Sequence, residues 1–136
     1  MNNTIPIPHL AVSDGEAAIA FYEKAFGAKL EAKHPAEDGK RLMHAHLTLG
    51  AGTLFLHDEF PEFSDQDTGG AKAPTRLGGA SCVFHLDVPD ADAAWERALE
   101  AGAATIMPLD NQFWGARYGQ LKDPFGHIWS IGGPVK

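Results

Sequence analysis

The 136-residue sequence lacks the features that mark several large classes of protein. Its one cysteine, Cys82, excludes an internal disulfide and favours a reducing compartment, so we expect a cytoplasmic protein. No apolar run approaches the ~20 residues that a membrane-spanning helix needs, and residues 1–4 do not begin like a signal peptide. The sequence therefore predicts no association with a membrane.

Basic residues are also scarce. The chain has 11 Lys and Arg against 18 Asp and Glu, which gives a formal net charge of −7. Nucleic acid binding needs a stripe of Lys and Arg against the phosphates, so nucleic acid is not an expected partner. An acidic surface is compatible with a cationic ligand. The hydrophobic content of 44% is ordinary for a globular protein, and the length suits a single domain.

An internal repeat is the strongest pattern that is present. His9-Leu-Ala-Val-Ser-Asp14 recurs as His85-Leu-Asp-Val-Pro-Asp90. An Ala-rich stretch with helical periodicity follows each copy, and each stretch ends in Gly-Ala, at residues 27–28 and 102–103. Strand, cap, helix and glycine stop in the same order twice indicate two copies of one β-α-β unit.

Periodicity and turn residues place the remaining elements. In the first half they predict strands at residues 4–12, 29–34, 42–49 and 53–58, with a helix that ends near Phe26. In the second half they predict a strand at 80–88 with Cys82 on its buried face, a helix capped by Asp90, a short strand at 105–107 and a loop at 108–115. A hairpin that turns at Asp123-Pro-Phe-Gly126 ends the chain, and the whole is an α+β fold.

Residues 59–79 show no clear periodicity and separate module 1 (residues 4–58) from module 2 (residues 80–133). This segment is interpreted either as a solvated linker or as a lid over a ligand. If Leu49 faces Thr53, antiparallel pairing in module 1 sets His46 opposite Leu56 and His44 opposite Asp58.

Two β-α-β-β-β modules that end in Asp-Pro-Phe-Gly-His-Ile-Trp-Ser-Ile (residues 123–131) resemble the vicinal oxygen chelate superfamily. That superfamily includes glyoxalase I, extradiol dioxygenases, fosfomycin resistance enzymes and bleomycin-binding proteins. Residues 112–119, Gln-Phe-Trp-Gly-Ala-Arg-Tyr-Gly, resemble its PhnB-like branch, although that branch usually has an acidic residue at Ala116 and an aromatic residue at His9. The resemblance implies curved mixed sheets that enclose a groove, and a homodimer.

The resemblance also implies where a metal would bind. The positions of the family's usual ligands fall on Ile7, Leu56, Val83 and Ser130, three of which are aliphatic, so no metal is expected at the standard positions. A displaced site is the alternative. His9, Asp58 and His85 follow two residues further along three of those strands, and imidazole and carboxylate ligands suit Zn, Ni or Fe.

Two functions follow from these observations. In the first, the groove binds and sequesters a planar or cationic small molecule without chemistry. In the second, a metal on the displaced cluster supports a glyoxalase-like lyase or a dioxygenase. A domain with no ligand is a third possibility. Arg117 is interpreted either as a contact to an anionic or planar ligand or as the partner of a nearby carboxylate on the hairpin. The expected ligand-binding residues are His9, His44, His46, Asp58, Phe60, His85, Trp114, Arg117, Tyr118 and Ser130.

Overall fold

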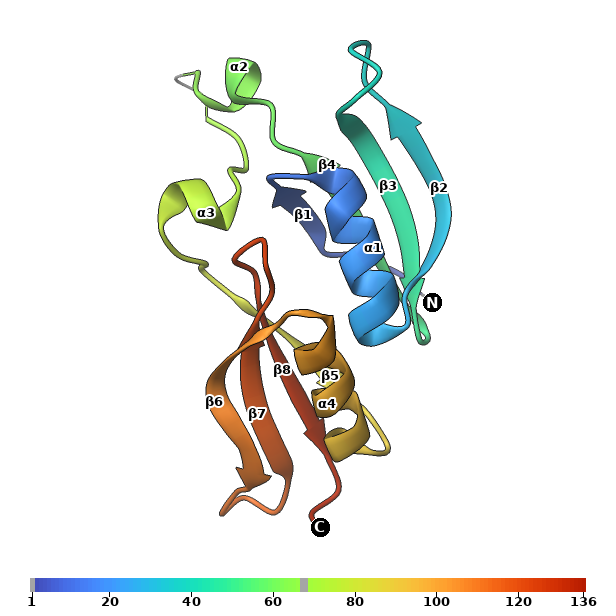
Figure 1. Cartoon of the computed structure of the whole chain (residues 1–136). Coiled ribbons are helices and arrows are strands. Elements are labelled where there is room, and N and C mark those ends of the chain that lie inside the picture. Colours follow the sequence, from blue (N-terminus) through green and yellow to red (C-terminus); the bar gives the residue numbers. More distant parts are fainter. Residues whose placement is uncertain (1, 67–68) are drawn as a thin grey trace. The chain divides into compact units, whose positions relative to one another are not determined.

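A computed structural model describes residues 2–66 and 69–136 of the chain (Figure 1). The chain divides into two units. Unit 1 comprises the residues up to Ala73 except Lys24–Phe26, and unit 2 comprises those three residues together with Pro74–Lys136.

Unit 1 contains one four-stranded sheet with the strand order β1-β4-β3-β2. Strand β1 runs parallel to β4, and the other neighbours are antiparallel. The elements, in chain order, are β1 (His9–Val12), α1 (Gly15–Phe26), β2 (Lys29–Pro35), β3 (Leu42–Leu49) and β4 (Gly52–Asp58).

Unit 2 contains a second four-stranded sheet of the same topology, with the order β5-β8-β7-β6 and with β5 parallel to β8. The predicted α+β fold of two β-α-β-β-β modules with curved, mixed sheets is therefore confirmed (Figure 1). The elements are β5 (Val83–Asp87), α4 (Ala91–Ala101), β6 (Ala104–Asn111), β7 (Arg117–Lys122) and β8 (Ile128–Gly133).

The two long helices begin in the same way. The carboxylate of Asp14 accepts a hydrogen bond from the Ala17 amide, and that of Asp90 accepts one from the Ala93 amide, both at 3.1 Å. These side chains satisfy amides that the first turn of a helix leaves without a partner. Helix α1 ends at Gly27, whose φ of 72° suits a residue without a Cβ atom.

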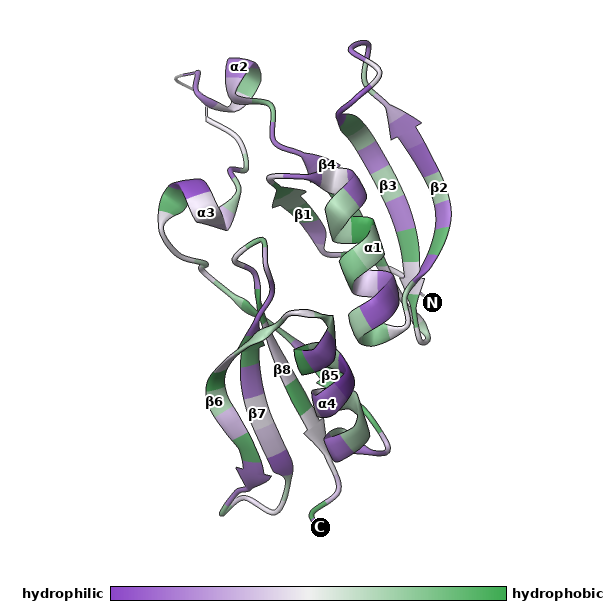
Figure 2. Ribbon diagram, viewed as in Figure 1, coloured by the Kyte–Doolittle hydropathy of each residue, from purple (hydrophilic) through white to green (hydrophobic). Residues whose placement is uncertain are grey.

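Alternation along the strands separates a helix-facing side of each sheet from an opposite side. In unit 1 the helix-facing side is apolar and buried, and it includes Leu10, Val12, Ala45, Leu47 and Leu56. Along β3 the intervening residues are polar, which gives the banded pattern of that strand in Figure 2. The opposite side of each sheet is thus free to carry polar and aromatic side chains.

The register of the β3–β4 hairpin differs from the prediction. Leu49 pairs with Gly52, so Gly50 and Ala51 form a two-residue turn. The φ of 59° at Gly50 matches the first position of a type II′ turn. The pairing is consequently shifted by one residue, and His46 lies opposite Phe55 instead of Leu56.

Strand β6 is longer than predicted. It continues through Pro108 to Asn111, where a loop was expected. The pairing with β7 is irregular between Met107 and Asp110, and β6 is an edge strand of its sheet. A proline is tolerated there because its missing N–H leaves no inner neighbour unpaired.

Two further expectations are corrected. Strand β1 begins at His9 and not at residue 4. Cys82 is exposed and precedes β5. The segment between the modules contains two short helices, α2 (Pro61–Ser64) and α3 (Pro74–Leu77), while its residues 67 and 68 lie outside the described residues. No helix in the described ranges is long and apolar enough to cross a membrane.

Candidate functional site

Three of the expected ligand-binding residues lie on the side of the unit 2 sheet that faces away from the buried core, namely His85, Tyr118 and Ser130. Registered pairing sets His85 beside Ser130 and Tyr118 beside Gly132, so these residues share one side. Trp129 and Ile131, which alternate with them on β8, are buried on the other side. The period of two along a strand therefore builds this surface.

Hydrogen bonds link three side chains of this surface in a row, Ser130, His85 and Asp87. The Nδ1 atom of His85 lies 2.7 Å from the Ser130 hydroxyl, and its Nε2 atom lies 2.9 Å from a carboxylate oxygen of Asp87. A carboxylate only accepts, so Nε2–H donates to Asp87, and in the neutral ring Nδ1 accepts from Ser130. Ser130 is buried and the Asp87 side chain is 91% exposed, so this row leads from the interior to the surface.

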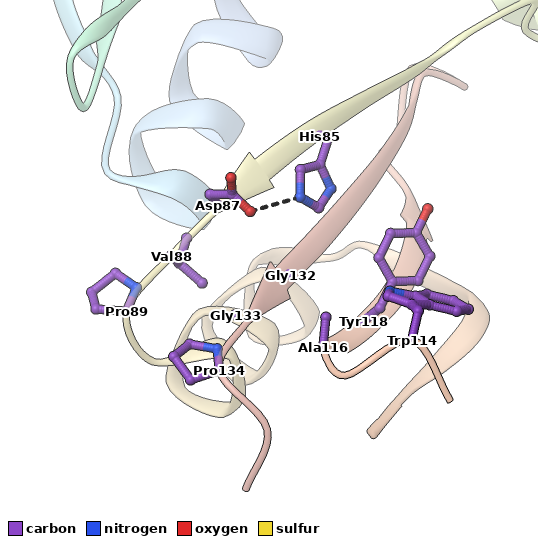
Figure 3. A pocket seen from close by; sticks show the side chains of 10 residues that line it. All are labelled: His85, Asp87, Val88, Pro89, Trp114, Ala116, Tyr118, Gly132, Gly133 and Pro134. Carbon is purple, nitrogen blue, oxygen red and sulfur yellow. Dashed lines mark hydrogen bonds and ion pairs between the residues drawn. The ribbon is translucent and has the colours of Figure 1, made fainter. Parts of the chain in front are cut away.

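Aromatic rings border these three hydrogen-bonded side chains and a hollow of about 610 Å³ (Figure 3). The Tyr118 ring stacks on His85 at 5.8 Å between ring centres, and Trp114 meets Tyr118 edge to face at 5.6 Å. The tyrosine hydroxyl accepts a hydrogen bond from the Gln120 amide at 3.0 Å. The small residues Ala116, Gly132 and Gly133 line the hollow and leave its volume open.

Arg117, which was expected to meet a ligand, is engaged elsewhere. Its guanidinium donates to both carboxylate oxygens of Asp92, at 2.9 and 2.8 Å, and also to the Asn111 side chain at 3.2 Å. The hydrogen bond with Asp92 raises the pKa of Arg117 and lowers the pKa of Asp92. Arg117 thus pairs with a carboxylate, as one of the two interpretations held, but this carboxylate lies on α4 and not on the hairpin.

Unit 1 gathers histidines on the side of its sheet that faces away from the core. Phe55 lies among them, with ring centres 5.7 Å from His9, 4.6 Å from His44 and 5.2 Å from His46. His57 joins this group at 4.9 Å from His9. The expected residues His9, His44 and His46 are therefore brought together, around an aromatic ring that the sequence interpretation did not include.

The electrostatics of the histidine group disfavour charge at its centre. Burial lowers the pKa of His9, and repulsion from His57 and His44 lowers it further. His9 therefore loses its proton more readily than an isolated imidazole does.

Asp58 lies on the other side of the same sheet. Its partner in the β1–β4 register is Val12, whereas the partner of His9 is Phe55. Its two carboxylate oxygens accept hydrogen bonds from the backbone amides of Gly15 at 2.7 Å and Leu42 at 2.6 Å. The expectation that Asp58 shares a surface with His9 is wrong, because the register places Asp58 on the buried side of the sheet. Both oxygens of its carboxylate accept hydrogen bonds from backbone amides there.

Phe60 borders a separate hollow of about 560 Å³ in unit 1. The Arg41 guanidinium lies over its ring at 4.4 Å and also donates to Asp38 and Glu62. The hydrogen bond from Arg41 lowers the pKa of Asp38 to about 2. One cation, Arg41, thus faces three carboxylates in the lining of this hollow, Glu37, Asp38 and Glu62, so the hollow keeps a net negative charge.

Asp87 is the member of the candidate site that the sequence interpretation missed. The signal was present, because His85-Leu86-Asp87 places two polar side chains two residues apart on one side of a predicted strand. His57 was also missed as a member of the histidine group. It is next to Asp58 along β4, so it faces the opposite side of the sheet. Strand parity finds both residues once the buried side is known.

Comparison with known proteins agrees with this architecture. The family model described as the Glyoxalase/Bleomycin resistance protein/Dioxygenase superfamily matches residues 4–131. The chain belongs to this superfamily. An uncharacterised protein of Mycobacterium bovis is 46% identical over 129 residues, which cover 95% of this chain and 82% of that protein.

Solved structures of similar fold include two that cover nearly the whole of this chain. TioX from Micromonospora sp. ML1 has a TM-score of 0.75 at 25% identity, with 98% of this chain and 100% of that chain covered. A glyoxalase-related enzyme from Fulvimarina pelagi has a TM-score of 0.74 at 20% identity, with 97% and 88% covered. The second likeness concerns the fold alone.

The metal that many members of the superfamily use does not fit the residues of this chain. Repeat and register together equate the pair His9 and Phe55 with the pair His85 and Ser130, so Phe55, not Leu56, is the counterpart of Ser130. Ile7 and Val83 are aliphatic, Phe55 is aromatic, and the Ser130 hydroxyl is bonded to His85. Within residues 2–66 and 69–136, no group of three or more His, Cys, Asp or Glu side chains is arranged to hold a metal ion.

Proposed function

We propose that this protein binds and sequesters a planar, cationic small molecule in the unit 2 hollow, without a metal at the superfamily's usual positions. We also assign it to the PhnB-like branch, on the sequence of the β6–β7 hairpin at residues 112–119. The single observation that carries the proposed function is an aromatic wall, formed by Trp114 and Tyr118, beside the carboxylate of Asp87.

The aromatic wall favours a flat ligand. Trp114 is 52% exposed, whereas the other two tryptophans, Trp95 and Trp129, are buried. Large exposed rings beside a hollow offer stacking surface, and the face of Trp also attracts cations. The expected ligand is therefore a fused or conjugated ring system.

Charge favours a cation. Among the ten residues that line the hollow, all of them described, Asp87 is the only one with a formal charge when histidine is neutral. Its side chain is 91% exposed, and the chain as a whole has a net charge of −7. A positively charged ring is thus attracted both at a distance and on contact.

Binding is tested by calorimetry with two probes, metal-free bleomycin and N-methylacridinium, a permanently charged flat ring. Replacing Trp114 with Ala is expected to weaken binding about 10-fold or more, because stacking and cation–π contacts contribute about 1–3 kcal/mol. Quenching of tryptophan fluorescence by the ligand should also disappear, since Trp114 is the exposed tryptophan.

Phe113→Ala is the matched control. Phe113 is 96% exposed and neighbours Trp114, but it does not line the hollow. Its replacement should leave affinity within about twofold, as for a surface change that removes no ligand contact. Absence of heat with both probes, or equal losses in the two variants, would contradict the proposed site.

We propose in addition that the protein is a homodimer. Each sheet ends in two edge strands, β1 and β2 in unit 1 and β5 and β6 in unit 2, and exposed edges favour pairing with another chain. Light scattering of untagged protein at micromolar concentration should give twice the chain mass of 14.6 kDa. A mass equal to one chain would refute the dimer.

A further inference from the structure

We infer that His85 determines which ligand charge the unit 2 hollow accepts, so that a cation is held while the imidazole is neutral and released when it is protonated. This inference rests on the proposed function and adds the control of the same site. It is carried by the hydrogen-bond chain from Ser130 through His85 to Asp87, together with the close seat of the ring on β8.

The seat of the His85 ring depends on a glycine. A Cβ atom at position 132 would lie 2.7 Å from Cε1 and 3.0 Å from Nε2 of His85. Gly132 therefore lets the ring lie against the backbone of β8, with one nitrogen at Ser130 and the other at Asp87. Both nitrogens are held, so a change in the protonation of this ring acts directly on the Asp87 carboxylate.

The two protonation states give the hollow different charges. In the neutral state Ser130 donates to Nδ1 and Nε2–H donates to Asp87, which leaves a full negative charge facing the hollow. In the protonated state Nδ1–H donates to the Ser130 oxygen, and the imidazolium cancels the charge of Asp87. Histidine is the side chain type that most often changes its charge between about pH 5 and 8, so this range is the one in which to compare the two states.

The other groups around His85 do not replace this control. Tyr118 on β7 stacks on the ring and accepts from Gln120. Arg117 is bound to Asp92 on α4, and Lys136 at the chain end lies 4.0 Å from the same carboxylate. Arg117 also lies 4.0 Å from Asp110, so these two cations face two carboxylates, and the pair of His85 and Asp87 sets the charge at the hollow.

The experiment measures the affinity of N-methylacridinium between about pH 8 and pH 5 in about 0.15 M salt, where long-range charge effects are screened. The charge of this probe does not titrate. The expected result is a loss of affinity of about fivefold to tenfold on acidification, since a positive charge then appears beside the bound cation. Acridone, a neutral ring system of similar shape, should bind with an affinity that changes less than about twofold, because the added charge has no charge to repel.

Variants separate the inference from the general titration of the protein. His85→Gln should lose most of the pH dependence of acridinium binding, measured as the ratio of its own affinities at about pH 8 and pH 5. Asp87→Asn should weaken acridinium binding at about pH 8 by about tenfold without changing the binding of acridone. The matched control is His46→Gln, on the unit 1 sheet, which should keep the pH dependence of the natural chain.

Gly132→Ala is a second, independent variant. It keeps the imidazole but displaces the ring from its seat, and the pH dependence should fall with it. If neither probe binds, the proposed function itself fails. If acridinium binds with the same pH profile in the natural chain and in His85→Gln, the site stands and the inference about His85 is overturned.

Discussion

Replacing Asp58 with Ala is expected to lower the free energy of unfolding by about 3–4 kcal/mol, because two buried backbone amides lose a charged acceptor at once. The carboxylate is 6% exposed and accepts from the Gly15 and Leu42 amides at 2.7 and 2.6 Å. It joins the end of β4 to the first residue of α1 and to the first residue of β3. Water cannot readily replace the carboxylate as the acceptor for these two buried amides, so the variant should not recover most of the lost stability.

The fit around Asp58 also restricts its neighbour. A Cβ atom at Gly15 would lie 2.6 Å from the Oδ2 atom of Asp58. The helix therefore begins with a residue that has no side chain, and the carboxylate occupies the space. Asp58→Asn keeps the size and one acceptor oxygen, so it should destabilise the protein less than the Ala variant.

Chemical unfolding by urea, followed by circular dichroism, measures the effect. The control is Asp14→Ala, which removes the exposed cap of the same helix, with one hydrogen bond of 3.1 Å, and should cost about 1 kcal/mol. Equal effects of the two variants would mean that Asp58 is not the structural carboxylate inferred here. They would also reopen a role for it as a ligand.

The fold could be predicted because its signals are local and repeated. Asp14 and Asp90 cap helices, and Gly27 and Gly102 follow the ends of helices, at corresponding places in the two halves. Each of these features depends on a few neighbouring residues and on elementary backbone geometry. Their order along the chain was enough to identify two β-α-β-β-β modules.

The candidate site was harder to predict because it depends on register. A two-residue turn at Gly50 and Ala51 shifts the β3–β4 pairing by one position. Phe55 therefore lies on the polar side of the sheet, where Leu56 was predicted. The same parity places Asp58 on the buried side, away from His9. Turn length is decided by backbone conformation at one glycine, and the sequence Gly-Ala-Gly allows more than one choice.

Residue partners outside the strand also escaped prediction. Arg117 pairs with Asp92, 25 residues earlier on α4, and no short-range pattern links the two. By contrast, His85 and Asp87 are two residues apart, and a strand places them on the same side. Contacts that follow strand periodicity were accessible from the sequence, whereas contacts that depend on helix packing were not.

Replacing Asp123 with Ala is expected to lower the free energy of unfolding by about 3–5 kcal/mol, since three hydrogen bonds to one buried carboxylate are lost. Its Oδ1 atom accepts from the Phe125 and His127 amides at 2.9 and 3.0 Å, and its Oδ2 atom accepts from the indole N–H of Trp129 at 2.9 Å. The carboxylate thus closes the β7–β8 turn and fixes the Trp129 ring on β8.

A double-mutant cycle with Trp129→Phe isolates the indole contact. Phe keeps an aromatic ring at this buried position but lacks the N–H donor, so that variant alone should cost less than Asp123→Ala. The two losses should add to more than the loss in the double variant, because both single variants break the same bond to Asp123. Strict additivity in thermal or urea unfolding would show that the indole bond contributes nothing, and that the two backbone amides alone account for the role of Asp123. Ser130 lies between Trp129 and Ile131 on β8, so a fixed Trp129 also fixes the strand that positions Ser130 against His85.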